Sequence, residues 1–201
     1  NDELAEKLRV LRNHGASLTD LQRHLGPRPY LLSDHIYPGF NIRMTDIQAA
    51  LGSEQLKRGK EILSERIALA DKYNQAFESL KMLNIPSQKV NYTNGYQSYP
   101  CLFQPIMVKK ALKEKRYEIL DEVKTLRNNL MDKLQQKGIS TRPATHAVHM
   151  LSFFKEKYKL LPESYPVSFA ANNCTISLPL FNGMSKDEQD YVIQNVLQEL
   201  R

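Results

Sequence analysis

The chain has 201 residues, which is enough for a hydrophobic core and for one large or two small domains. Hydrophobic residues make up 41% and charged residues 25%, as in ordinary soluble globular proteins, and no run is long and apolar enough for a transmembrane helix. The net charge of +6 allows anionic ligands, but the densest basic stretch, residues 109–116 (KKALKEKR), carries no aromatic–basic recognition motif, which disfavours a nucleic-acid binder.

The first predicted element is a short amphipathic helix over residues 2–12. Leu4, Leu8 and Leu11 fall on one face, and acidic residues occupy the first turn. These acids stand where a secretory signal peptide would have bases, so a signal peptide is not predicted. Gly15 is a plausible helix stop, and residues 16–38 are rich in turn-forming proline and glycine.

A second helix is predicted to begin at Thr45. Thr45 and Gln48 form a T-x-x-Q capping box, in which each side chain bonds the backbone N–H of the other residue. The helical pattern runs to about Leu80, while Gly52 and Gly59 weaken its first half and indicate a kink or a close contact. A helix of this length usually crosses between layers or domains.

The remaining elements indicate a small α+β lobe after a boundary near residues 81–95. An aromatic and branched strand is predicted over 96–108, at an edge or interrupted, because Pro100 and Pro105 cannot donate to a sheet. The pattern then predicts a helix with a stripe from Ile119 to Leu134, a short strand over 139–143, an irregular segment, a half-buried strand over 174–181, and a helix opened by the capping box of Ser185 and Glu188.

The two cysteines are too few for a disulfide scaffold and lack metal-ligand spacing. Cys101 and Cys174 are therefore predicted to be buried small hydrophobic residues, which fits a reducing cytoplasm. His146 and His149 form an H-x-x-H pair, but no helical zinc frame or third ligand accompanies it, so no metal site is predicted. A nucleophile elbow, a Cys–His frame and a phosphate-binding glycine loop are also absent.

One segment, GFNIRMTDIQAALG over residues 39–52, suggests a binding function. Asn41 and Arg43 stand just ahead of a helix start, where free N–H groups attract anions and a guanidinium strengthens the attraction. The alternative is structural: Arg43 pairs with a nearby acid such as Asp46, and Asn41 shapes the turn. The residues alone leave both interpretations open.

The same segment resembles the G-[YF]-N-x-R-[ML]-T-[DE]-[IL]-Q-A-A-[LI]-G block of the DegT/DnrJ/EryC1/StrS family of pyridoxal-phosphate-dependent sugar aminotransferases. The resemblance covers nearly the whole chain, with similar blocks in the family's order at residues 1–15, 96–103, 138–150 and 176–196. It implies the fold-type-I aminotransferase architecture: residues 1–80 would be the end of the large domain plus a long interdomain helix, and residues 81–201 the small α+β domain.

The resemblance also implies what this chain lacks. In the family, the lysine that forms the Schiff base, the aspartate that pairs with the pyridine nitrogen and the glycine-rich turn all precede the segment that matches Asn1. No catalytic residue is therefore assigned here, and pyridoxal phosphate is not expected to bind covalently to this chain. The chain resembles the C-terminal half of such an enzyme, whether as a fragment, a split protein or a truncated homologue.

Site residues follow from the resemblance residue by residue. Asn41 would contact the cofactor phosphate bound by the opposite subunit of a homodimer, and Arg43 would belong to the same rim or bind the substrate diphosphate. His149 matches the family's P-x-H block and would lie near the nucleotide sugar. The implied partners are a nucleotide-linked keto-sugar and an amino donor such as glutamate, with neither nucleic acid nor membrane. The alternative is a non-catalytic binding or dimerisation module that kept the fold.

Overall fold

The computed structural model describes residues 1–16 and 34–200 and divides into two compact units, Asn1–Arg58 (unit 1) and Gly59–Arg201 (unit 2). The turn-rich region predicted over residues 16–38 lies mostly outside the described residues. Within the described part of the chain, no helix is long and apolar enough to cross a bilayer.

The described residues of unit 1, 1–16 and 34–58, form two short helices. Helix α1 (Asp2–Leu11) is capped by the side chain of Asn1, which accepts from the backbone N–H of Leu4 at 3.1 Å. Helix α3 (Asp46–Lys57) starts after Thr45, and both halves of the predicted capping box are present. Neither helix has a buried residue, so capping and short-range hydrogen bonds position them more than a core does.

Two glycines allow the backbone of residues 37–39 to lie against the end of α1. Gly15 has a φ of +72°, and a Cβ there would stand 1.8 Å from the carbonyl oxygen of Tyr37. A Cβ on Gly39 would stand 2.0 Å from the backbone nitrogen of Gly15. Since neither position has room for a side chain, the two backbones meet directly, which fixes where the following residues run.

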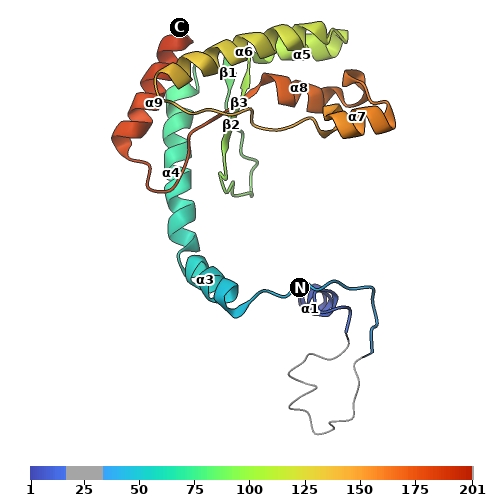
Figure 1. Ribbon diagram of the computed structural model, residues 1–201. Helices are drawn as coiled ribbons and strands as arrows, with labels where there is room; N and C mark the ends of the chain where they lie inside the picture. Colours follow the sequence, from blue (N-terminus) through green and yellow to red (C-terminus); the bar gives the residue numbers. More distant parts are fainter. Residues whose placement is uncertain (17–33, 201) are drawn as a thin grey trace. The chain divides into compact units, whose positions relative to one another are not determined.

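Unit 2 begins with helix α4 and contains every strand of the described chain (Figure 1). Its elements in chain order are α4 (Gly59–Phe77), β1 (Leu83–Asn84), β2 (Tyr99–Phe103), α5 (Pro105–Glu114), α6 (Glu118–Gln136), the 3-10 helix η1 (Val148–Met150), α7 (Ser152–Tyr158), the 3-10 helix η2 (Pro162–Ser164), α8 (Pro166–Cys174), β3 (Thr175–Leu178) and α9 (Lys186–Glu199).

The predicted long helix is two helices, α3 and α4, interrupted at Arg58 next to one of the two weakening glycines, Gly59. Residues 59–77, which the resemblance groups with the end of the large domain, form α4, and α4 packs within unit 2. The Tyr73 hydroxyl donates to the carbonyl of Pro179 at 2.8 Å, and the Gln189 amide donates to the carbonyl of Leu69 at 2.6 Å. Tyr73 and Phe77 are fully buried.

The sheet is antiparallel with strand order β1–β2–β3, and it lies between α4 and α8 in Figure 1. Tyr99, Cys101 and Phe103 alternate inward along β2, as a half-buried strand requires. Of the two alternatives predicted from Pro100 and Pro105, the edge strand is wrong, because β2 is central, and the interrupted strand is confirmed, because β2 ends at Phe103. Proline is accommodated because β1 pairs only with Leu102 and Phe103, so Pro100 has a strand partner on the β3 side alone.

One predicted strand is shorter in the structure, and another is not a strand. The strand predicted over 96–108 ends at Phe103, because Pro105 occupies the first turn of α5, where its missing N–H costs nothing. The strand predicted over 139–143 is reduced to one bridge between Arg142 and Ser177. The predicted helix with its stripe from Ile119 and the helix after Ser185 are confirmed as α6 and α9, and both cysteines are buried and free, as predicted.

Candidate functional site

Residues 40–44 of unit 1 run as an extended segment along the end of α1. The N–H of Phe40 donates to the carbonyl of Leu11 at 2.8 Å, and the N–H of Ile42 donates to the carbonyl of Arg12 at 2.9 Å. Asn41 forms an isolated antiparallel bridge with Asn13. This pairing fixes the direction of each successive side chain, because side chains alternate along extended backbone.

The alternation separates apolar from polar side chains. The even-numbered residues of the segment line an open groove of about 700 Å³ against α1, whose lining is Ala5, Leu8, Arg9, Leu11, Arg12, Phe40, Ile42 and Met44. Asn41 and Arg43 do not line this groove. The two polar residues therefore form a separate exposed pair, immediately ahead of the capped start of α3.

Asn41 and Arg43 contact one another. The Nε of Arg43 donates to the Oδ1 of Asn41 at 3.1 Å, and this bond holds the asparagine amide in one orientation. The amide NH2 of Asn41 then remains a donor, and no described residue accepts from it. An amide donor beside a guanidinium suits a phosphate group, which accepts hydrogen bonds and carries negative charge. The pair is thus compatible with one side of a cofactor-phosphate site.

A second candidate site lies in unit 2, around His149. A cavity of about 540 Å³, within the range of small-molecule sites, is lined by His146, Val148, His149, Phe154, Tyr158, Leu160, Tyr165 and Ser168. These residues come from the loop before η1, from η1 and α7 and their connections, and from α8. The structure therefore places the predicted His149 at a cavity in unit 2 and the predicted Asn41 and Arg43 together in unit 1.

His149 is an unusual histidine. His149 is only 6% exposed, and its buried Nε2 atom has no hydrogen-bond partner in the described part of the chain. The Tyr165 ring stands 5.2 Å away between centroids, at 58°. His146 lines the same cavity but is exposed, and among the described residues no group of three metal-ligand side chains is present. A buried imidazole nitrogen without a partner favours a ligand that supplies one.

A partly buried polar network holds the loop that carries His149. The N–H of Ala147 donates to the side-chain oxygen of Asn172 at 3.1 Å, and the N–H of Ala144 donates to the hydroxyl of Thr175 at 3.3 Å. Asn172 and Thr175 lie at the end of α8 and the start of β3. The loop is therefore tied to the junction of a helix and a strand, two elements that do not shift easily.

Arg127 of α6 joins this network through hydrogen bonds to the backbone of Asn172 and Thr175. It is 3% exposed, and its Nη1 donates to the backbone carbonyls of Asn172 at 2.9 Å and Thr175 at 3.1 Å. Its Nε and Nη2 donate to the side chain of Asn128. Burial lowers the pKa of the Arg127 guanidinium from its usual value. The guanidinium supplies donors to carbonyls at the end of α8, where a helix leaves its own acceptors unsatisfied.

The aromatic walls of the cavity and the network behind it were not found from the sequence. Phe154, Tyr158 and Tyr165 lie in the stretch predicted to be irregular, and Arg127 reads as one more charged residue of an amphipathic helix. One signal was available: Arg127 falls between Val123 and Leu130 on the buried stripe of α6, where a charge needs buried partners.

Comparison with known proteins identifies the family to which the chain is similar. The family model described as "DegT/DnrJ/EryC1/StrS aminotransferase family" matches residues 1–197. The chain is 29% identical over 196 residues to the spore coat polysaccharide biosynthesis protein SpsC of Bacillus subtilis, covering 98% of this chain and 46% of that protein. It is 30% identical over 162 residues to the GDP-perosamine synthase of Escherichia coli O157:H7, covering 81% and 38%.

The fold is also shared with a solved structure. A putative sugar aminotransferase, Spr1654 from Streptococcus pneumoniae in its PMP form, superposes with a TM-score of 0.72 at 21% identity, covering 98% of this chain and 45% of that one. The predicted fold class is thereby confirmed. The chain spans about half the length of the curated relatives it matches.

Proposed function

The chain belongs to the DegT/DnrJ/EryC1/StrS aminotransferase family, and we propose that it is the C-terminal portion of a pyridoxal-phosphate-dependent nucleotide-sugar aminotransferase. The complete enzyme would move an amino group, from a donor such as glutamate, onto a keto-sugar nucleotide. Residues 1–58 and α4 would belong to the end of the large domain and its connection, and the sheet and later helices to the small domain. Alone, the chain would not transaminate, because the lysine that holds the cofactor would lie outside it.

The observation that carries the proposal is the Asn41–Arg43 pair. The extended segment 40–44 turns its apolar side chains into a groove and leaves an oriented amide donor and a guanidinium on another face. This donor pair fits a phosphate. When bound, the cofactor supplies an electron sink that stabilises negative charge next to the reacting carbon. The part of these two residues is to bind and orient the phosphate end, with the opposite subunit of a homodimer supplying the rest.

The role of Asn41 is tested by exchanging its donor for a repelling acceptor. In the complete protein, Asn41→Asp should raise the Kd for pyridoxal phosphate by about 10- to 100-fold, since hydrogen bonds to charged groups contribute about 1.5–3 kcal/mol. The matched control is Gln55→Glu, which makes the same amide-to-carboxylate change on the exposed part of α3. Equal cofactor affinity for the two variants would remove Asn41 from the site.

Contact across subunits is tested by mixing two variants of the complete protein at a pyridoxal phosphate concentration too low for either to be active alone. One carries Asn41→Asp, and the other lacks the cofactor-binding lysine but keeps Asn41. If Asn41 acts on its partner's site, each mixed dimer regains one intact site and roughly a quarter of the activity returns. No recovery, with dimer exchange verified, would place Asn41 in its own subunit's site or in none.

The enzyme hypothesis is tested separately by reading the gene upstream of the codon for Asn1. A lysine followed by a G-E-G-G-like turn supports the aminotransferase. A start codon directly before Asn1 would instead favour a binding or dimerisation module that kept the fold.

A further inference from the structure

The chain contains two Asn-Gly dipeptides, Asn94-Gly95 in the loop between β1 and β2, and Asn182-Gly183 after β3. We propose that Asn94 is a site of spontaneous modification, at which the side-chain amide is converted to a carboxylate without an enzyme. The fold holds the amide of Asn182 in a way that prevents the same reaction. The inference does not depend on the proposed function, since it concerns only the chain and water.

The reaction joins two neighbouring residues. The backbone nitrogen of Gly95 attacks Cγ of Asn94, loses its proton to water and forms a cyclic imide. The bond from Cγ to the amide nitrogen breaks, and this nitrogen takes up a proton and leaves as ammonia. Water then opens the imide. Opening at the new bond gives aspartate, whereas opening at the original peptide bond gives isoaspartate, in which the main chain runs through Cγ.

The first argument is access to the attacking nitrogen. Gly95 is exposed, and a Cβ built on it would meet no atom within 4 Å. Among the described residues, no acceptor takes a hydrogen bond from its N–H. Because glycine has no side chain, its nitrogen approaches a neighbouring carbon more easily than that of any other residue. The nucleophile at Gly95 is therefore open to solvent and to Cγ of Asn94.

The second argument is the geometry of the Asn94 side chain. Its Oδ1 accepts from the backbone N–H of Tyr96 at 2.9 Å, which closes an Asx turn. The ring of this turn contains both Cγ of Asn94 and the nitrogen of Gly95, so the two atoms that must join lie on the same side of the chain. The N–H of Tyr96 also points at the oxygen on which negative charge develops during the attack. A donor already in place there stabilises the transition state.

The third argument is the contrast with Asn182. Its Oδ1 accepts from Nε of Arg66 at 2.8 Å, and its Nδ2 donates to the carbonyl of Ile62 at 3.0 Å and to Oε2 of Glu65 at 2.8 Å. The N–H of Gly183 donates to Oε1 of Glu65 at 2.6 Å. The amide of Asn182 is thus bound to α4 and not to its own backbone. These four hydrogen bonds must break before Gly183 can attack.

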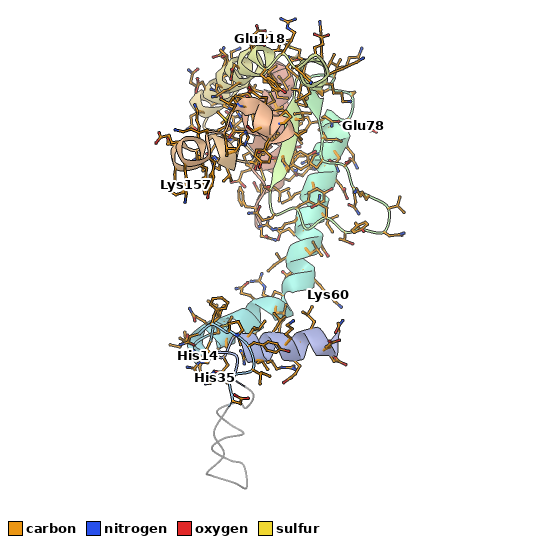
Figure 2. All side chains as sticks on the ribbon, turned by 90° about the vertical axis from the view of Figure 1, so that its right-hand side faces the viewer. His14, His35, Lys60, Glu78, Glu118 and Lys157 are labelled. Carbon is orange, nitrogen blue, oxygen red and sulfur yellow. The ribbon has the colours of Figure 1, made fainter. Side chains whose placement is uncertain are left out.

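The modification would loosen the loop between β1 and β2. The carbonyls of Tyr96 and Gln97 accept from Nη1 of Arg66 at 2.8 and 3.2 Å. The loop therefore lies alongside α4, whose two ends are marked by Lys60 and Glu78 in Figure 2. Isoaspartate lengthens the main chain just before Tyr96, which moves both carbonyls relative to the guanidinium.

The test is the rate of deamidation in the purified chain, incubated at neutral pH, digested and analysed by mass spectrometry. The references are synthetic peptides of residues 90–98 and 178–187, in which the fold has no effect. Asn94 should react at least as fast in the folded chain as in its peptide. Asn182 should react at least about tenfold more slowly than in its peptide, because its hydrogen bonds must break first.

Gly95→Ala is the matched variant, because its Cβ would meet no atom and its φ does not require glycine. It should keep the near-ultraviolet circular dichroism of the wild type and slow the reaction at Asn94 at least about tenfold. Glu65→Ala removes two of the hydrogen bonds around Asn182 and should speed its reaction toward that of the peptide. After incubation, limited proteolysis within residues 85–98 should be faster in the wild type than in Gly95→Ala.

Two results would overturn the inference: a folded Asn94 that reacts more slowly than its peptide, or equal rates at Asn94 and Asn182 in the folded chain. Equal proteolysis of the incubated wild-type and Gly95→Ala chains would overturn the loosening of the loop. These measurements need neither cofactor nor substrate, so their failure leaves the proposed function untouched, and an inactive complete protein leaves the modification site untouched.

Discussion

Replacing Arg127 with methionine should destabilise unit 2 and loosen the loop that carries His149. Methionine keeps an apolar stem of similar length but removes the donors to the carbonyls of Asn172 and Thr175, which lie 2.9 and 3.1 Å from Nη1. A buried acceptor that loses its partner costs about 1–3 kcal/mol. Two carbonyls lose their donor, but the variant no longer has to bury a guanidinium charge, which offsets part of the loss. We therefore expect the free energy of unfolding to fall by about 2–4 kcal/mol.

The assay is urea unfolding followed by near-ultraviolet circular dichroism, because the fully buried Tyr73 and Tyr99 give a tertiary signal specific to unit 2. The control is Lys124→Met, an exposed position of the same helix, which should change stability by less than about 0.5 kcal/mol. Amide exchange at Ala147 should also quicken in the Arg127 variant, since Asn172 holds that N–H. A variant as stable as the control would refute the reasoning and show that desolvation outweighs these hydrogen bonds.

Three further predictions concern a close approach of two backbone segments, a helix cap and a surface ion pair. Gly39→Ala should detach residues 39–41 from α1, because its Cβ would stand 2.0 Å from the nitrogen of Gly15; limited proteolysis of unit 1 should accelerate, and an unchanged cleavage rate would contradict the close approach. Thr45→Ala should remove about 1 kcal/mol from α3, seen as faster amide exchange at Gln48, whereas exchange at the wild-type rate would mean that the capping box contributes little. Hydrogen bonds from the ammonium groups of Lys137 and Lys133 lower the pKa of Glu199. Its contribution to stability is therefore present above the unfolded pKa of about 4.3 and is lost as pH falls through the lower folded value. Glu199→Gln should reduce the loss of stability at acid pH, and an unchanged loss would exclude these two ion pairs as its source.

Local signals predicted the helices with strong caps or stripes. The capping boxes at Thr45 and Ser185 both form, because each depends only on residues three apart. The apolar stripe of α6 is buried, as its spacing predicts. Gly138, at a φ of +75°, follows the end of α6, as a terminating glycine should. These features need no knowledge of distant parts of the chain.

Features that depend on distant partners were missed or misplaced. Pro100 indicated an edge strand or an interrupted one, and the sequence did not show that β1 is short enough for a central strand to contain the proline. Helix α8 buries Phe169, Ala170, Asn173 and Cys174 on one face, in contact with α6 and the sheet, but this stripe spans less than two turns and includes an asparagine. The backbones at Gly15 and Gly39 approach closely, and no local sequence pattern predicts this contact between two segments that are far apart along the chain.

The candidate sites show the same division. The resemblance singled out Asn41, Arg43 and His149 by motif, and the structure adds that the first two contact each other and that the third lies at an aromatic cavity. Their roles toward cofactor and substrate remain proposals. The supporting residues behind His149, Asn172 and Arg127, act through backbone carbonyls and amides, which a sequence motif does not display.

The measurement that tests the central claim most directly is the position of the cofactor's covalent attachment. The complete protein encoded by the gene is incubated with pyridoxal phosphate, reduced with borohydride and digested, and the modified peptide is identified by mass spectrometry. The account predicts one modified lysine, in a peptide upstream of Asn1, and an unmodified chain over residues 1–201. Stoichiometric modification of any lysine within residues 1–201 would contradict it.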